Sequence, residues 1–127
     1  MPTTISGNTG VSQVQADATQ GSLPLFGCRA WVNFAGTKDT TGATSTANTN
    51  RLINASGNVT SVLRNGTGDY TVTFTEAPPD ANYAAVVTSN AAQGLVGTLS
   101  TSTINVITTN SAGSSADASI VSVAIFR

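Results

Sequence analysis

The stretch TSVLRNGTGDYTVTFT (60–75) constrains the fold more than any other part of the chain. Two alternating runs of apolar and polar residues flank the segment NGTG (65–68), whose glycines supply the positive φ angles that tight turns need. A four-residue loop places Arg64 opposite Asp69 as an exposed charge pair across the strands. In this register the apolar face carries Val59, Leu63, Tyr70, Val72 and Phe74. The sequence therefore predicts an antiparallel β-hairpin with Gly68 at positive φ.

Further strands are predicted on both sides of the hairpin. The stretch NYAAVVT (82–88) is expected to pair beside the second arm, with Tyr83 opposite Phe74. SIVSVAIFR (119–127) is apolar on both faces, which is typical of a central strand or an interface strand. The remaining predicted strands are 28–34, 51–55, 95–100 as an edge strand, and 104–109. Short strands with a turn signal every 8–12 residues indicate an all-β chain, an antiparallel β-sandwich of jelly-roll-like form.

The domain organisation follows from where these patterns begin. Residues 1–24 have weak periodicity and much Ser, Thr, Gln and Gly, so they are predicted to be an N-terminal stem or attachment segment. Residues 25–127 are predicted to form the β-sandwich. Two polar segments, 35–50 and 110–118, are expected to be long exposed loops.

The chain carries very little charge. Charged residues are 9% of the sequence, against an average of about 25% for soluble domains. Thr, Ser and Asn suit a solvated sheet surface, but they lack the charge that normally keeps sheet edges from pairing with neighbouring molecules. The composition therefore favours association of subunits.

Composition also excludes several classes of function. The net charge is −1 and the five basic residues are scattered, so a nucleic-acid partner is not expected. No apolar run approaches the roughly 20 residues that span a bilayer, and MPTTISGNTG lacks the pattern of a signal peptide. Membrane insertion is therefore not expected. The single cysteine, Cys28, is predicted to be a small core side chain in a protein assembled in a reducing cytoplasm.

The residues that enzymes use are mostly missing. There is no histidine, which removes the usual triads and the commonest metal ligand. Cys28 has no basic partner that would activate its thiol. Asp69 is assigned to Arg64, and the other acidic residues fall in loops. We therefore expect no catalytic site, no metal and no cofactor.

Three segments carry a resemblance to a known family. The strings are FGCRAWVNFAGT (26–37), INASGNVTSVLRNGTGDYTVTFT (53–75) and PDANYAAVV (79–87). Together they resemble the C-terminal (distal) domain of tailed-bacteriophage tail fibre proteins. The resemblance implies a homotrimeric knob in the virion that contacts the host surface without catalysis. Its implied partners are other virion tail or capsid proteins and a host surface glycan or outer-membrane protein.

The sequence departs from this family at TKDTTGATSTANTN (37–50), where only a short turn is expected, and it lacks a long shaft. The chain is therefore either a short virion fibre or a distal fragment. Because loops can vary while the sheets keep their packing, we expect receptor contacts on the two loops. The candidate residues are Lys38, Asp39, Thr40, Thr41, Asn110 and Ser111.

Trp31 is a further candidate, because it lies on the opposite strand face from Val32 and could stack on a ligand. A subunit interface would account for it equally well. Two other functions remain open. One is a purely structural virion component, such as a capsid-decorating fibre or a baseplate piece. The other is a carbohydrate-binding module, which the missing signal peptide and the lack of an aromatic platform disfavour.

Overall fold

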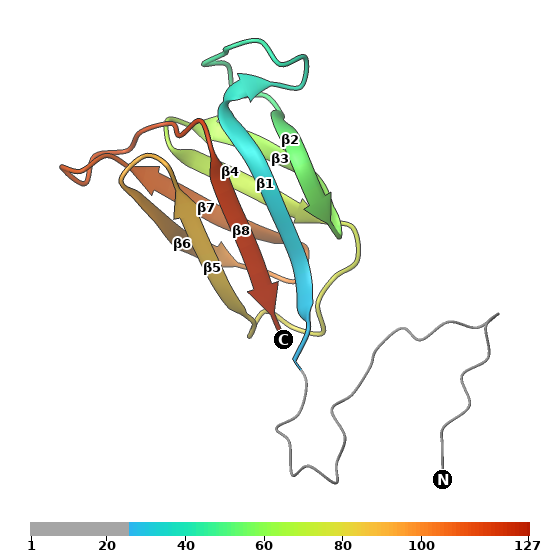
Figure 1. Cartoon of the computed structure of the whole chain (residues 1–127). Helices are drawn as coiled ribbons and strands as arrows, with labels where there is room; N and C mark the ends of the chain where they lie inside the picture. The colour runs from blue at the N-terminus through green and yellow to red at the C-terminus, as the bar shows by residue number, and fades with distance from the viewer. Residues whose placement is uncertain (1–25) are drawn as a thin grey trace, which may run out of the picture.

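A computed structural model describes residues 26–127, which form eight β-strands and no helix (Figure 1). The predicted stem (1–24) lies outside the described residues. The strands are β1 (Cys28–Asp39), β2 (Arg51–Gly57), β3 (Val59–Gly66), β4 (Asp69–Phe74), β5 (Ala84–Ser89), β6 (Gln93–Leu99), β7 (Thr103–Thr109) and β8 (Val121–Phe126).

The strands make two antiparallel four-stranded sheets. The first has the order β2-β1-β8-β5 and the second β3-β4-β7-β6. The all-β sandwich predicted from the sequence is confirmed, and its eight strands are the number found in jelly rolls. The strand at 119–127 is central as predicted, because β8 lies between β1 and β5, and β6 is an edge strand as predicted.

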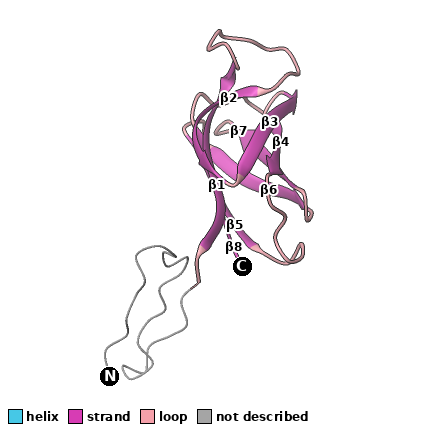
Figure 2. Cartoon of the chain, turned by 90° about the vertical axis from the view of Figure 1, so that its right-hand side faces the viewer, coloured by secondary structure: helices cyan, strands magenta, loops and turns pink. Residues whose placement is uncertain are grey.

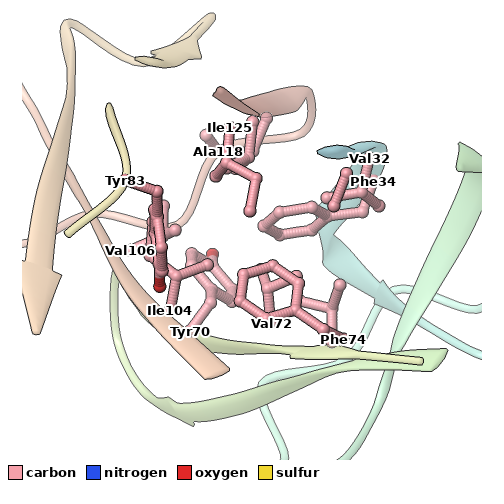
Figure 3. Close-up of a cluster of buried hydrophobic side chains, with 14 residues drawn as sticks. Val32, Phe34, Tyr70, Val72, Phe74, Tyr83, Ile104, Val106, Ala118 and Ile125 are labelled. Carbon is pink, nitrogen blue, oxygen red and sulfur yellow. The ribbon is translucent and has the colours of Figure 1, made fainter. Parts of the chain in front are cut away.

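The core lies between the inner faces of the two sheets and is held by aromatic pairs (Figure 3). The rings of Phe34 and Tyr70 meet edge to face with centroids 5.1 Å apart, and those of Phe74 and Tyr83 do so at 5.8 Å. Such pairs stabilise a core beyond the area they bury, by about 0.5–1.5 kcal/mol each. The first pair joins β1 of one sheet to β4 of the other, and the second joins β4 to the segment that leads into β5.

The register of the β3–β4 hairpin differs from the prediction. Val59 lies opposite Phe74 as expected, but Arg64 lies opposite Tyr70 rather than Asp69. The ladder shifts by one residue between Val59 and Ser61 and again between Arg64 and Gly66. The prediction assumed a ladder without bulges, and a slip of one residue exchanges the two faces of a strand. Consequently Val62 and Arg64 point into the sandwich, while Leu63 is exposed.

The predicted neighbour of the hairpin is also corrected. β4 pairs with β7 in the second sheet, whereas β5 pairs with β8 in the first. Tyr83 does meet Phe74, but across the sandwich rather than along one sheet. The chain between β4 and β5 is long enough to change layers, so the apolar pattern of 82–88 fits either sheet.

Cys28 is exposed rather than part of the core. The β1–β8 register shifts between Cys28 and Ala30, so the alternation that buries Ala30, Val32 and Phe34 does not extend back to Cys28. A bulge near a strand end thus removes the cysteine from the predicted apolar face.

The two ends of the sandwich are occupied by different parts of the chain. β1 begins and β8 ends at one end, which we call the entry end (Figure 1). The loops after β1 and after β7 lie at the opposite end, which we call the loop end, and Figure 2 shows the first of them far from the C-terminus. At the entry end Asn58, with φ of 58°, joins the sheets by donating to the carbonyls of Arg29 and Glu76 at 3.0 Å each.

Candidate functional site

The loop end is built on two turns of the same design. After β1, the Asp39 carboxylate accepts the backbone N–H groups of Thr41 and Ala43, and Gly42 has φ of 86°. After β7, the Asn110 side-chain oxygen accepts the N–H groups of Ala112 and Ser114, and Gly113 has φ of 81°. An Asp or Asn that caps its own turn, followed by a glycine at positive φ, gives a compact reversal.

The match between the turns extends into the chain on both sides. Backbone bonds join Ser45 N–H to the Thr37 carbonyl and Ala116 N–H to the Thr108 carbonyl. Each turn is therefore the tip of a short two-stranded extension, and the segments 37–45 and 108–116 are equivalent in hydrogen bonding. The two loops are thus ordered by their own sequences at their tips.

The six predicted loop residues all lie on these two tips. Lys38, Thr40, Thr41 and Ser111 are exposed, as is Asn110, and Asp39 is half-buried. Asp39 and Asn110 hold the turns together, so their side-chain oxygens are engaged within the loop. The hydrogen bond from the Thr41 hydroxyl is the main cause of the lowered pKa of Asp39. The residues free to meet a ligand are therefore Lys38, Thr40 and Ser111.

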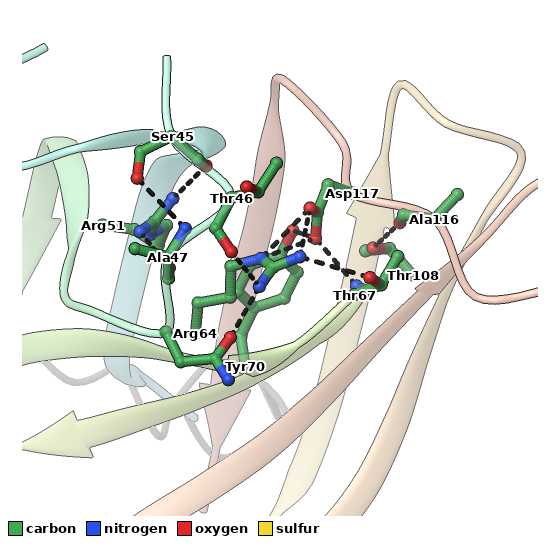
Figure 4. A network of polar contacts seen from close by, with 12 residues as sticks. Ser45, Thr46, Ala47, Arg51, Arg64, Thr67, Tyr70, Thr108, Ala116 and Asp117 are labelled. Atoms are coloured by element: carbon green, nitrogen blue, oxygen red, sulfur yellow. Dashed lines mark hydrogen bonds and ion pairs between the residues drawn. The ribbon is translucent and has the colours of Figure 1, made fainter. Parts of the chain in front are cut away.

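Arg64 ties the two loops to the sandwich (Figure 4). Its Nη2 lies 2.8 Å from Asp117 Oδ2, and its Nε donates to both oxygens of that carboxylate. Its Nη1 donates to the Thr46 carbonyl at 2.7 Å and to Asn48 Oδ1 at 2.6 Å. Since Asp117 follows the second turn while Thr46 and Asn48 follow the first, one buried guanidinium connects both loops.

Asp117 accepts hydrogen bonds from two further groups. Its Oδ1 accepts the Gly68 N–H and the Tyr70 hydroxyl, each at 2.8 Å. Burial alone raises the pKa of Asp117, but the bonds from Arg64, Gly68 and Tyr70 outweigh it and leave the pKa below its ordinary value. Burial, followed by the bond to this carboxylate, raises the pKa of Tyr70. Asp117 is therefore held as an anion beside the Arg64 cation.

A second arginine, Arg51, is held by the first loop alone. It is 1% exposed, and it donates to the carbonyls of Ser45, Ala47 and Thr49 at 2.7–3.1 Å. The Thr49 hydroxyl accepts a further bond at 2.8 Å. The segment 45–49 therefore wraps around a buried cation, which explains why this long polar loop is ordered.

Trp31 lies apart from the loop end. It stands on the outer face of β1 with 44% of its surface exposed, and its indole covers Gly57 of β2. A shallow depression near the first loop is lined by Thr40, the β2 residues Arg51–Ile53, and Ser61 of β3, among others. Among residues 26–127 there is no group of three His, Cys, Asp or Glu side chains that could hold a metal ion.

Comparison of the chain with protein-family models, with curated proteins and with solved structures found no match. In the part of the chain that the structure describes, no helix is long and apolar enough to cross a membrane.

Sequence reasoning missed the residues that hold the site together, namely Arg51, Arg64, Gly68, Tyr70 and Asp117. One signal was present. Arg64 alternates with Val62 on the same face of β3, so burial of Val62 implies burial of Arg64. Its partner could not be found in this way, because Asp117 lies 53 residues further along in a segment without periodicity.

Proposed function

We propose that this chain is the distal domain of a phage virion tail fibre, a non-enzymatic, trimeric adhesin that contributes to attachment to the host-cell surface. The observation that carries the proposal is the placement of two ordered loops at the end opposite to the chain entry (Figure 1). A segment that enters at one end leaves the other end free to present Lys38, Thr40 and Ser111 outward.

Rigidity supports the same proposal. Flexible loops lose conformational entropy when they bind, at about 0.5–1.5 kcal/mol for each rotamer-rich side chain that becomes fixed. Here the loop backbones are already fixed by Arg51, Arg64 and the two capped turns. Three copies on one tip would then add avidity, which can exceed a single contact by roughly 10²–10⁴.

The contacts favour a receptor with hydroxyl or anionic groups. The exposed tip residues are one ammonium and several hydroxyls, and no aromatic side chain lies among 38–41 or 110–111. Lys38 can donate to carboxylate, phosphate or hydroxyl oxygens. A host surface glycan or the polar loops of an outer-membrane protein would both supply such groups.

The second candidate function is a structural virion component without a receptor. It is favoured by the internal use of the loop's polar groups, since the Asp39 carboxylate and the Asn110 amide oxygen are occupied within their own turns. A loop that mainly cages Arg51 and Arg64 could serve stability alone.

The test is binding of the fluorescently labelled 127-residue chain to a panel of intact bacterial cells. The variant Lys38→Ala/Thr40→Ala/Ser111→Ala removes exposed groups but leaves the capped turns in place, and we expect at least a tenfold loss of binding. The control Thr98→Ala/Thr101→Ala removes exposed hydroxyls away from the loop tips and should bind normally. Binding that is unchanged in the triple variant would refute the role of the tips, and a chain that binds no cells would favour the structural function.

A further inference from the structure

The outer faces of the two sheets differ in the polarity of their exposed side chains. In the first sheet, Trp31 of β1 lies opposite Ala124 of β8, which lies opposite Val86 of β5. Nearer the entry end, Phe126 lies opposite Ala84. Residues directly opposite one another share a face of the sheet. We call Trp31, Ala84, Val86, Ala124 and Phe126 the outer apolar face.

This face is exposed although it is apolar. Val86 is 55% exposed, Trp31 44% and Phe126 38%. Contiguous exposed apolar side chains of this kind mark interaction sites on soluble proteins. Between Trp31 and Val86 the surface dips over Ala124 into a shallow hollow of about 410 Å³, so the face offers both projecting side chains and a recess.

Several side chains in the polar row beside the outer apolar face are hydrogen-bonded to one another. Asn33 Nδ2 donates to Ser122 Oγ at 2.9 Å, and Asn54 Nδ2 donates to Asn33 Oδ1 at 2.8 Å. Covering this row therefore leaves fewer unpaired polar groups, which otherwise oppose association. None of the residues on the outer apolar face or in this row is charged.

Two arginine side chains at the entry end have partners within the chain. Arg127 lies 2.9 Å from Asp80, and Arg29 donates to the Arg127 carbonyl. The cores of protein interfaces are depleted in charged residues and enriched in aromatic ones. When the same neutral face of each copy turns toward a common axis, it meets no unmatched charge on the neighbouring copies.

We propose that the outer apolar face is the surface through which this chain associates with a second copy of itself. The inference deepens the proposed trimeric assembly, on which it rests, by naming the surface that the copies use. The outer apolar face reaches the entry end, where Phe126 lies opposite Cys28, the first residue of β1.

The outer face of the second sheet provides a matched contrast. Leu95 of the edge strand β6 is 46% exposed, close to the value for Val86. However, its row continues through Ile107 to the charged Asp69, which accepts hydrogen bonds from Asn65 and Asn105. A second copy placed there would cover a carboxylate, so this face is not assigned to association.

The experiment compares Val86→Glu with Leu95→Glu in the 127-residue chain by size-exclusion chromatography with light scattering at micromolar concentration. We expect an oligomer for the wild type and for Leu95→Glu, and the mass of a monomer for Val86→Glu. Circular dichroism checks that both variants stay folded. An oligomer of Val86→Glu equal to that of the wild type would overturn the proposal, as would a wild type that is monomeric or a Leu95→Glu that alone dissociates.

A second measurement needs no variant. Trp31 is the only tryptophan, so its emission should shift to the red when dilution separates the copies and water reaches the indole. Emission that stays constant while the mass falls would place the interface elsewhere and overturn the assignment. Cell binding of the wild type is measured separately. If Val86→Glu dissociates the oligomer but the wild type binds no cells, the interface stands and the adhesin function is refuted. If the wild type binds cells but Val86→Glu stays oligomeric, only the interface is refuted.

Discussion

Arg51 and Arg64 are both almost completely buried, at 1% and 5% exposure, yet their charges are compensated differently. Arg64 faces the carboxylate of Asp117 and also donates to groups of the first loop. The side-chain donors of Arg51 meet only carbonyl and hydroxyl oxygens between Ser45 and Thr49. The first loop therefore compensates the buried charge of Arg51 with its own carbonyl and hydroxyl oxygens, whereas the second loop compensates the charge of Arg64 with a carboxylate.

The largest effect is expected from Asp117→Ala. Removing one partner of a buried ion pair leaves the other charge without compensation, which costs about 3–5 kcal/mol. Chemical denaturation should show a lower midpoint with an unchanged slope. Asp80→Ala is the control, because it removes a carboxylate at a similar distance from Arg127 in an exposed pair, and it should change stability little. Equal losses in the two variants would contradict the role of Asp117 as the counter-ion of the buried Arg64.

Gly68→Val should follow in size. Gly68 has φ of 65°, and a Cβ there would collide with the Thr108 carbonyl and the backbone of Ala116. Strain at positive φ and overpacking together should cost about 3 kcal/mol. Thr67→Val, one residue earlier, loses a single bond from Arg64 and should cost about 1 kcal/mol. Thermal unfolding of both variants measures the two losses of stability. Equal shifts of the midpoint temperature would argue against the assigned turn.

Arg51→Met should be milder than Asp117→Ala. It removes a charge rather than isolating one, and water can reach much of the loop whose carbonyls lose their donor. We expect a loss of about 1–3 kcal/mol, together with faster proteolysis within 44–50. A loss as large as that of Asp117→Ala would mean that the carbonyl cage matters as much as the ion pair. Unchanged proteolysis would mean that the loop is ordered without Arg51.

The smallest effect concerns pH. The pKa of Asp117 is below its ordinary value of 3.8 in the fold, so its stabilisation is complete above the unfolded pKa and is lost as pH falls through the folded one. The difference in unfolding free energy between the wild type and Asp117→Asn should therefore be constant near neutrality and narrow below about pH 4. Asp80, whose pKa is lowered to about 2, is common to both proteins and cancels. A difference that widens in acid would contradict the assignment.

The sequence was sufficient to predict a sandwich of two sheets, but not the side-chain contacts that connect the sheets and loops. Alternation identified the inner face of β4 and, apart from Cys28, that of β1, because apolar and polar residues alternate over several positions in each strand. For β8 it indicated two apolar faces and therefore a central strand, but did not distinguish the inner face from the outer one. Of the two glycines expected at positive φ in the hairpin turn, Gly68 has it and Gly66 does not. These features depend on neighbours in the chain, which a single sequence displays.

Two of the errors, the register of the hairpin and the burial of Cys28, have their origin in β-bulges. Bulges beside Asn65 and Thr60 shift the ladder of β3, and a bulge near Arg29 exposes Cys28. A bulge adds one residue without a compositional mark, so the faces that follow it are inverted in any prediction from alternation. The carbonyl groups around Arg51 could not be predicted for a different reason, because every residue has a backbone carbonyl and the sequence does not mark which ones accept a hydrogen bond from a side chain.

The direction of β1 has a mechanical consequence. This strand runs for 12 residues from the entry end to the loop end and pairs with β2 on one side and β8 on the other. If the loops held a ligand while the chain was pulled from the entry end, the force would act parallel to β1. The ladder hydrogen bonds of β1 lie perpendicular to that force. Such a pull must shear many bonds at once instead of opening them singly, so the sandwich is oriented to withstand stretching along its length.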